Sequence, residues 1–410
     1  MAKKIQHYIF ILISYLTLIH NITPQEQIEP LVYGSNDGTF NVLLEMGEPA
    51  QMVYLRLDMA QTASWLTHNV YRPEHSYSGT NIGEASSMQL GYFVYDSQIK
   101  KESLRVKKKH FNLDNFYFHY LDIERPEGTF DSLALPYIFK DTKMSLVHQL
   151  YKNGSLSKKQ FSFVPIDQDV GYIYLGDLPK EILKKNNFKQ IASCKVDPHH
   201  NTWGCNVEKV YIDTNVYESD QYAHFNTISK YTFVPHSFMS FFSETFMREY
   251  LNNNVCQYDS SSDTYQCNCD ELKQFPKVVI VLGGQSIKLS KDVLFICIGS
   301  QCKLTLKTNP MNMNWIFGTD FIEKHITTFN YDKGTIEIYS NRTQFGGYSD
   351  FNYYLTGRKN ISFIQILIIF TSAIFVTLLL GFIYMKVKHY SHKKRNKKRK
   401  KKYHNQISLI

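Results

Sequence analysis

The sequence predicts an all-β protein of two similar lobes with few short helices, followed by one C-terminal transmembrane helix. Short apolar runs with alternating, β-branched or aromatic residues fill most of the chain, and aromatic residues make up 15% of it. Only two stretches are typical of helices, and each follows a strand-rich block, so the element order repeats. An uncharged run of 25 residues, Ile361 to Met385, lies near the C-terminus.

Residues 1–24 are predicted to be a signal peptide. Lys3 and Lys4 precede an apolar stretch of 12 residues, Tyr8 to Ile19, which is too short to span a bilayer. No clean small-residue cleavage site follows, so a retained signal anchor is the alternative.

The two predicted lobes occupy residues 25–185 and 186–340. Runs such as `MVYLRLD`, `QFSFVPI`, `GYIYLGD` and `KVVIVLGG` favour strands, because they alternate or are rich in β-branched and aromatic residues. The helical stretches are `TKMSLVHQLYKNG`, ending at Asn153-Gly154, and `PHSFMSFFSETFMREYLNN`, which starts at Pro235. Each lobe therefore carries a short helix at a similar place in its element order.

The C-terminal part is predicted to be a stalk (341–360), a transmembrane helix (361–385) and a basic cytoplasmic tail (386–410). The apolar run is long enough to cross a membrane with some tilt. Residues 386–402 hold 11 Lys and Arg and no acid, which places the tail in the cytoplasm and the N-terminus in the lumen or outside the cell. Anionic lipid is a candidate partner of this tail, and a plain stop-transfer flank is the simpler interpretation.

The charge distribution argues against a nucleic-acid partner. The net charge is +9, and removing the 11 positive charges of the tail leaves −2 for the rest of the chain. A mildly acidic folded part has no broad basic face. No phosphate loop, nucleophile elbow or zinc spacing is present either, so we expect no cofactor and no metal.

A chain in the secretory pathway can carry N-glycans at Asn-x-Ser/Thr sequons and disulfides between its cysteines. Asn153 and Asn341 are N-glycan candidates, and Asn360 is the poorest one because it adjoins the membrane. All seven cysteines lie between Cys194 and Cys302 and are expected to form disulfides, which leaves one cysteine free or paired with another chain.

Eight segments in sequence order carry a family resemblance. The first is `YGSNDGTFNVLLEMGEPAQMVYLRLDMAQTASWL`, with a Gly-x-Pro-x-Gln turn, a strand ending in Asp58, and Trp65 seven residues later. The others are `FDSLALP`, `LVHQLYKNGSLSKKQFSFVPI`, `GYIYLGDLP`, `NTWGCNVEKVYI`, `AHFNTISKYTFVP`, `CNCDELKQFPKVVIVLGGQSIKLSKDVLFICIGSQC` and `WIFGTDFIEKHITTFNYDKGTIEIYS`. Together they resemble pepsin-like aspartic peptidases over about 310 residues. The resemblance implies two β-barrel lobes around a central cleft that binds protein or peptide.

The family's reaction needs two aspartates, one from each lobe, that share a proton around a water molecule. Each aspartate begins an Asp-Thr-Gly turn, and the resemblance implies that the threonine hydroxyls lock the two turns together. Asp58 keeps the first aspartate, but Met59 replaces the threonine and Ala60 replaces the glycine, whose absence crowds the turn.

The second turn is degenerate. Asn226 lies nine residues before Pro235, at the family's interval, and Asn-Thr-Ile-Ser stands where the family has Asp-Thr-Gly-Thr. An amide has neither a removable proton nor a charge, so Asn226 cannot share a proton with Asp58. Asp213 is the rival candidate, although it lies 22 residues before Pro235, and Asp220 is the other nearby acid.

The resemblance also implies binding residues and a disulfide pair. Tyr92 and Tyr95 are candidates for the tyrosine of the family's flap hairpin, whose usual glycines are missing here, and two ordinary strand tyrosines are the alternative. Thr227 and Gly318 are further binding candidates. For the disulfides, the resemblance implies the pair Cys269–Cys302. Apart from the resemblance, Cys256–Cys267 would close the `QYDSSSDTYQ` hairpin and Cys194–Cys205 would bridge adjacent strands, with Cys297 left as the odd thiol.

The leading hypothesis is a membrane-anchored, pepsin-like homologue that is catalytically impaired or inactive and binds protein or peptide in its cleft. The alternative is an active membrane-bound aspartic endopeptidase that uses Asp58 and an unrecognised second carboxylate. A third reading is a β-rich surface receptor or adhesin. The expected location is a membrane of the secretory pathway, at the cell surface or in an endosome or vacuole.

Overall fold

The computed structural model describes residues 31–341, except residues 37, 91–92, 106–111, 138–143, 168–169, 186, 273–274, 290 and 310–313. The predicted signal peptide, transmembrane helix, basic tail and all of the stalk but its first residue therefore lie outside the described residues. Within the described residues, no helix is long and apolar enough to cross a membrane.

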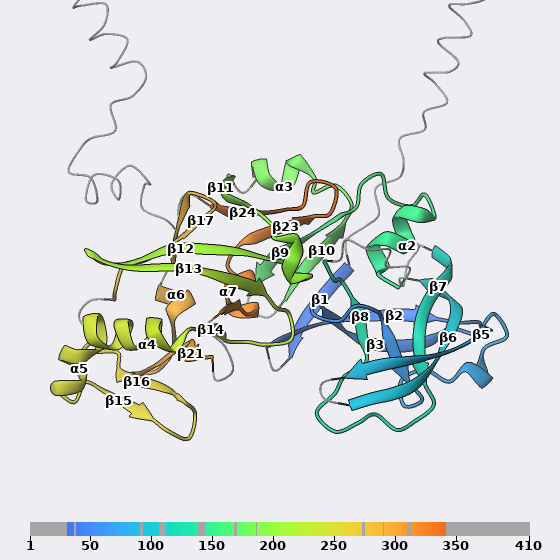
Figure 1. Cartoon of the computed structure of the whole chain (residues 1–410), viewed down its shortest axis with the longest axis horizontal. Coiled ribbons are helices and arrows are strands. Elements are labelled where there is room, and N and C mark those ends of the chain that lie inside the picture. The colour runs from blue at the N-terminus through green and yellow to red at the C-terminus, as the bar shows by residue number, and fades with distance from the viewer. Residues whose placement is uncertain are drawn as a thin grey trace, which may run out of the picture. The chain divides into compact units, whose positions relative to one another are not determined.

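The largest of the three sheets has 13 strands and takes strands from both halves of the chain (Figure 1). Its spatial order is β11-β24-β23-β9-β10-β1-β2-β3-β8-β4-β7-β6-β5. The strands of the first half are β1 (Leu31–Asn36), β2 (Thr39–Met46), β3 (Gln51–Asp58), β4 (Trp65–Thr67), β5 (Thr80–Leu90), β6 (Phe93–Arg105), β7 (Asn112–Leu121), β8 (Ser132–Ala134), β9 (Gln160–Asp167) and β10 (Val170–Leu175). Those of the second half are β11 (Phe188–Lys195), β23 (Ile326–Asn330) and β24 (Thr335–Asn341).

Two smaller sheets complete the second half. The seven-stranded sheet has the order β18-β17-β12-β13-β22-β14-β21, and the four-stranded sheet has the order β15-β16-β20-β19. The former contains β12 (Gly204–Ile212), β13 (Asn215–Phe225), β14 (Thr232–Val234), β17 (Val278–Leu282), β18 (Gln285–Leu289), β21 (Leu306–Thr308) and β22 (Trp315–Phe317). The latter contains β15 (Cys256–Asp259), β16 (Thr264–Asn268), β19 (Phe295–Ile298) and β20 (Gln301–Leu304).

The two halves repeat one arrangement of strands. In the first half, β3 runs parallel to β8, β8 is antiparallel to β4, and β4 is parallel to β7. In the second half, β13 is parallel to β22, β22 is antiparallel to β14, and β14 is parallel to β21. The predicted repeat in element order is therefore visible in the strand pairing.

Short helices connect the strands. The two predicted helical stretches contain α2 (Leu146–Lys152) and the run α4 (His236–Phe242), η3 (Ser243–Met247, one turn of π-helix) and α5 (Arg248–Asn252). The backbone of Gly154, just after α2, has a φ of +77°, which favours glycine at a helix end. The remaining short helices are η1 (Pro73–His75), α3 (Lys180–Lys185), η2 (Pro198–His200), α6 (Lys291–Leu294) and α7 (Thr319–Ile322).

The core is continuous between the halves and rich in aromatic rings. Phe161 of β9 stacks on Phe329 of β23, with ring centroids 4.9 Å apart, and both rings are buried. The buried Trp203 contacts both rings and donates its indole N–H to the carbonyl of Leu135 at 2.9 Å. These contacts join the first half of the chain to the second, next to the two turns that carry Asp58 and Asn226.

Candidate functional site

The turn at Asp58 forms although alanine replaces the expected glycine. Asp58 is the last residue of β3, and its Oδ1 accepts the backbone N–H groups of Ala60 and Gln61 at 2.8 and 3.1 Å. Ala60 is exposed, so its Cβ lies at the surface of the turn.

Asn226 occupies a comparable turn just after β13. Its Oδ1 accepts the backbone N–H of Ile228 at 2.7 Å, and its own N–H donates to the carbonyl of Phe317 at 2.9 Å. The amide side chain thus makes the hydrogen bond that holds this turn. The remaining side-chain atom, Nδ2, can donate hydrogen bonds but cannot take up a proton.

Thr227 joins the two turns. Its hydroxyl donates to the carbonyl of Leu57 at 2.7 Å, and its carbonyl accepts the N–H of Phe40 at 3.2 Å. Because Leu57 precedes Asp58 and Thr227 follows Asn226, the two turns lie side by side. Thr227 is fully buried, and the contact that its side chain makes is this bond between the turns.

Met59 stands where the other locking threonine was expected. Its side chain is 2% exposed and belongs to the apolar core. Met59 has no hydroxyl, so it cannot donate the side-chain hydrogen bond that a threonine of the first turn would make to the second turn.

Asp58 is a buried carboxyl group, with 6% of its surface exposed. Burial raises the pKa of Asp58, while the hydrogen bonds from Ala60 and Gln61 and the charge of Arg56 act in the opposite direction. A raised pKa favours the neutral acid, which can donate a hydrogen bond.

The rival acids lie elsewhere on the strand that leads to Asn226. Asp213 is exposed in the turn between β12 and β13, has a φ of +53°, and accepts the N–H of Lys277. The 11 residues of β13 separate this turn from Asn226. Asp220 is exposed within β13 at a φ of +44°. Asp213 is therefore a turn residue.

Gly318 lies at the N-terminal cap of α7, directly against the segment after Asn226. A Cβ atom on Gly318 would meet the carbonyl oxygens of Tyr231 and Ser229 at 2.4 and 2.7 Å. Glycine is needed here because two backbone segments approach closely, and this approach packs the start of α7 against the segment that follows Asn226.

A pocket of about 340 Å³ lies beside the Asp58 turn. The turn and the neighbouring strands β5 and β7 line it with Gln61, Thr62, Ala63, Ser87, Met88, Gln89 and His119. His119 Nδ1 lies 2.9 Å from the Ser97 hydroxyl, and burial lowers the pKa of His119, which favours its neutral ring. The lining is mostly polar, and Ala63 and Met88 are its apolar members. Ser87, Gln89 and His119 were not predicted from the sequence, because distant segments of the chain bring them together.

The hairpin of β5 and β6 adjoins the pocket beside the Asp58 turn, because β5 contributes Ser87, Met88 and Gln89 to the lining. Tyr95 of β6 is half-buried and packs against a small apolar cluster that contains Trp65, Met88 and Leu90. Tyr92 lies outside the described residues. Apolar contacts with Trp65 thus anchor this hairpin over the first turn.

Two of the expected disulfides, Cys194–Cys205 and Cys256–Cys267, are present. The third expected pair, Cys269–Cys302, is present as well, and the Cys297 sulfur also lies at bonding distance from Cys302. One sulfur atom forms one disulfide, so Cys302 can pair with only one of these two cysteines at a time. Three cysteine ligands are also fewer than the four of a structural zinc site.

The two glycan candidates lie at ends of secondary structure. Asn153 is the exposed C-cap of α2, and Asn341 is the half-buried last residue of β24.

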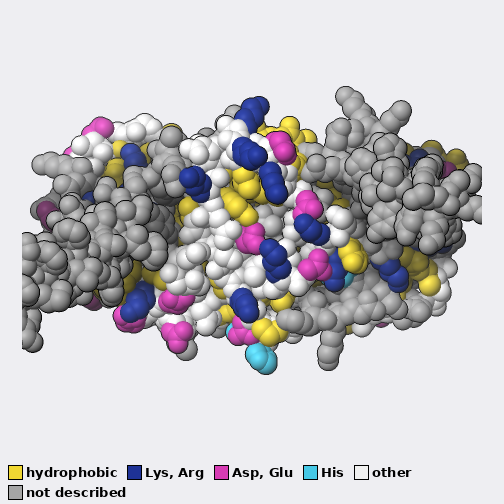
Figure 2. Space-filling view, turned by 90° about the horizontal axis from the view of Figure 1, so that it is seen from above, with side chains coloured by type: hydrophobic (Ala, Val, Ile, Leu, Met, Phe, Trp, Pro, Cys, Tyr) yellow, Lys and Arg dark blue, Asp and Glu magenta, His cyan; other side chains and the backbone are white. Residues whose placement is uncertain are grey.

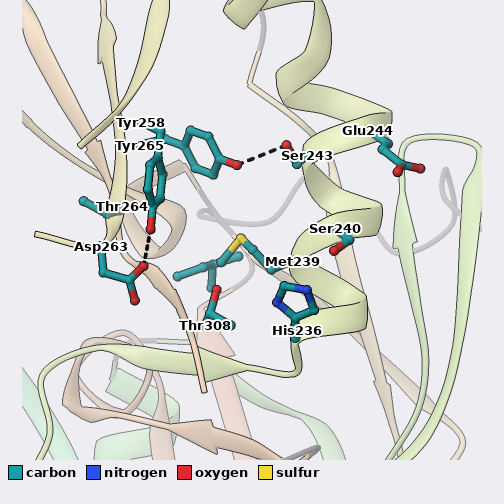
Figure 3. A pocket seen from close by; sticks show the side chains of 11 residues that line it. His236, Met239, Ser240, Ser243, Glu244, Tyr258, Asp263, Thr264, Tyr265 and Thr308 are labelled. Atoms are coloured by element: carbon teal, nitrogen blue, oxygen red, sulfur yellow. Dashed lines mark hydrogen bonds between the residues drawn. The ribbon is translucent and has the colours of Figure 1, made fainter. Parts of the chain in front are cut away.

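A second pocket lies away from the two turns, between the α4–η3 helix and the β15–β16 hairpin (Figure 3). Its volume is about 340 Å³, and its helical side carries His236, Met239, Ser243 and Glu244. Across it, the Tyr265 and Ser243 hydroxyls are 3.1 Å apart, which ties the hairpin to the helix.

Comparison with known proteins identifies the family. The sequence model of the family described as "Eukaryotic aspartyl protease" matches residues 28–340. The fold is similar to the crystal structure of the aspartic proteinase from Irpex lacteus, with a TM-score of 0.61 and 11% identity, covering 78% of this chain and 98% of that one. No curated protein matches the sequence. Since the family match spans most of the chain, and the mostly-β, bilobal structure agrees with it, this chain belongs to the eukaryotic aspartyl protease family.

Proposed function

We propose that this chain is a membrane-anchored, pepsin-like homologue that binds a protein or peptide in its cleft and does not cleave it. The observation that carries the proposal is the pairing of one carboxyl group, Asp58, with one amide, Asn226, on two turns that Thr227 holds side by side.

The chemistry of the family explains why this pairing removes catalysis. One ionised aspartate takes a proton from water while its protonated partner polarises the peptide carbonyl. Asn226 can do neither, and loss of one acid or base group lowers a rate by about 10²–10⁴-fold. Here the loss also abolishes the shared proton, so the mechanism itself is absent. The exposed positions of Asp213 and Asp220 do not favour either acid as a substitute.

The parts of the site that remain suit binding. Asp58 in its protonated form and the Asn226 amide can both donate hydrogen bonds to a peptide carbonyl. The pocket beside Asp58, with its polar lining of Gln61, Ser87 and Gln89, can take a side chain of the ligand. A pocket with a few well-placed polar groups is a general means of ligand recognition.

The sequence supports display of this site on the luminal or outer side of a membrane. A signal peptide in residues 1–24, a transmembrane helix in residues 361–385 and a basic cytoplasmic tail together make a single-pass protein.

Peptide retention on the full-length chain in detergent micelles tests the proposal. A mixed peptide library is passed over the immobilised protein at pH 4 to 7, and both retained and cleaved peptides are identified by mass spectrometry. We expect a subset of peptides to be retained intact.

The matched variants are Ser87→Trp, which fills the pocket, and Ser157→Trp, which places the same bulk on an exposed residue beyond α2. Ser87→Trp is expected to reduce retention at least tenfold and Ser157→Trp to leave it unchanged. Equal retention by both variants and the parent, or the absence of any retained peptide, would refute binding at this site.

A further inference from the structure

The three cysteines Cys269, Cys297 and Cys302 form a cluster outside the peptide site. Their sulfur atoms all lie within 4.8 Å of one another. Cys297 of β19 and Cys302 of β20 face each other directly in the antiparallel pair. Cys269 follows β16, and its N–H donates to the carbonyl of Ser300 in the β19–β20 turn at 2.8 Å, which holds it beside the same turn.

The cysteine count leaves one thiol in this cluster. Four of the seven cysteines form the Cys194–Cys205 and Cys256–Cys267 bonds, which leaves three that are close enough to pair with one another. Three sulfur atoms make one disulfide and one thiol. The thiol therefore always lies next to a disulfide that it can attack.

The three sulfurs differ in their access to solvent. Cys302 is fully buried, Cys269 is half-buried and Cys297 is exposed, next to Ile298, which is 79% exposed. When Cys302 pairs with Cys269, the remaining thiol is on the exposed Cys297. When Cys302 pairs with Cys297, the thiol is on the less accessible Cys269.

We propose that this cluster is a thiol–disulfide exchange site whose exposed member, Cys297, forms mixed disulfides with small disulfides such as glutathione disulfide. In the internal step, the Cys297 thiolate attacks the sulfur of Cys302, a new S–S bond forms, the Cys302–Cys269 bond breaks, and Cys269 leaves as a thiolate that takes a proton from water. In the external step, the Cys297 thiolate attacks one sulfur of glutathione disulfide, and glutathione leaves as its thiolate. Neither step needs a further oxidant.

The internal step changes what anchors one wall of the second pocket. The Cys269–Cys302 bond ties the chain just after β16 to β20, whereas the Cys297–Cys302 bond closes only the β19–β20 hairpin. The β15–β16 hairpin carries Tyr258, Asp263 and Tyr265, which line that pocket opposite the helix (Figure 3). Exchange at the cluster therefore switches a covalent restraint on this wall on and off.

Disulfide mapping of the full-length chain, made in an oxidising secretory host and kept in detergent, tests the site. The protein is held with and without glutathione disulfide at pH 5, 6, 7 and 8, quenched with acid and N-ethylmaleimide, and digested without reduction. We expect one alkylated cysteine per chain, shared between Cys297 and Cys269, and both linkages to Cys302. With glutathione disulfide, the adduct is expected on Cys297, and its rate of formation is expected to rise about tenfold per pH unit below the thiol pKa.

Two variants separate exchange from simple thiol reactivity. Cys297→Ser leaves only the Cys269–Cys302 linkage, no thiol and no adduct. Adding Cys205→Ser to this variant creates one thiol on Cys194, which is 4% exposed, and this thiol is expected to form no adduct and to displace no disulfide. A single linkage to Cys302 at every pH, or the lack of a glutathione adduct on the parent chain, would overturn the proposal.

Discussion

Side-chain chemistry at a few positions decides what this site can do. Asn226 keeps the hydrogen bond that shapes its turn, since its Oδ1 accepts the N–H of Ile228 as a carboxylate oxygen would. The substitution therefore removes a charge and a titrating proton without removing the turn. Thr227 in turn keeps the contact between the two turns through the carbonyl of Leu57. Both turns keep their hydrogen bonds while the second carboxyl group is absent, which is consistent with the proposed binding role.

Thr227 offers a direct test of the contact between the turns. Thr227→Val removes the hydroxyl at constant volume and takes the buried donor from the Leu57 carbonyl, so we expect a loss of about 1–3 kcal/mol of unfolding free energy. Urea unfolding of the variant and the parent measures this loss of unfolding free energy. Thr227→Ser keeps the hydroxyl and should recover most of the loss. Equal stability of the valine variant and the parent would show that the bond contributes nothing.

The elements around the site were predicted unevenly from the sequence. Alternation located β2, β3 and β10, and the glycine after α2 marked the end of that helix, because each signal is local. The pocket beside Asp58 was not predictable in this way, since β5, β7 and the Asp58 turn bring its lining together from distant segments. The position of Cys297 beside Cys302 was not predicted for the same reason, since it depends on the register of β19 with β20.

The element α7 carries a buried acid that couples stability to pH. Asp320 accepts the hydroxyl of Thr232 and the N–H of Phe321, but burial outweighs these bonds and raises the pKa of Asp320 to about 7. A carboxyl group whose pKa is raised by folding stabilises the protein when protonated. This contribution is complete below about pH 4 and is lost as the pH rises through about 7.

Asp320→Asn is therefore expected to flatten the pH dependence of stability between pH 4 and 7, by an amount on the order of a few kcal/mol. Urea midpoints at half-unit pH intervals measure this. Asp122→Asn is the matched control, because the Asp122 side chain is 76% exposed. The idea fails if the parent and Asp320→Asn curves run parallel across this range.

At the scale of the whole molecule, the two halves are built on one repeated strand arrangement and joined by a shared sheet and core. One face of the molecule carries Lys and Arg side chains interspersed with Asp, Glu and apolar side chains (Figure 2). The concentrated positive charge of the chain is in residues 386–402, which lie outside the described residues. The basic segment therefore belongs to the predicted membrane flank.

Membrane attachment and glycosylation can be tested together on the expressed chain. We expect the full-length protein to resist alkaline carbonate extraction and a chain ending at Tyr354 to be secreted, because the apolar run Ile361 to Met385 is then missing. Asn153→Gln and Asn341→Gln should each remove one glycosidase-sensitive gel shift. Secretion of the full-length chain would contradict the anchor, and unshifted mobility of the parent after glycosidase would contradict the glycans.

The most direct test of the account is peptide cleavage by the full-length chain, compared with Asp58→Asn and Asn226→Asp, from pH 3 to 7 with and without a statine-type inhibitor. The account predicts that the parent cleaves no faster than Asp58→Asn. It also predicts that Asn226→Asp, which restores the second carboxylate on an intact turn, gains inhibitor-sensitive cleavage at acid pH by about 10²-fold or more. Inhibitor-sensitive cleavage by the parent that disappears in Asp58→Asn would contradict it and would mean that a second carboxylate reaches Asp58.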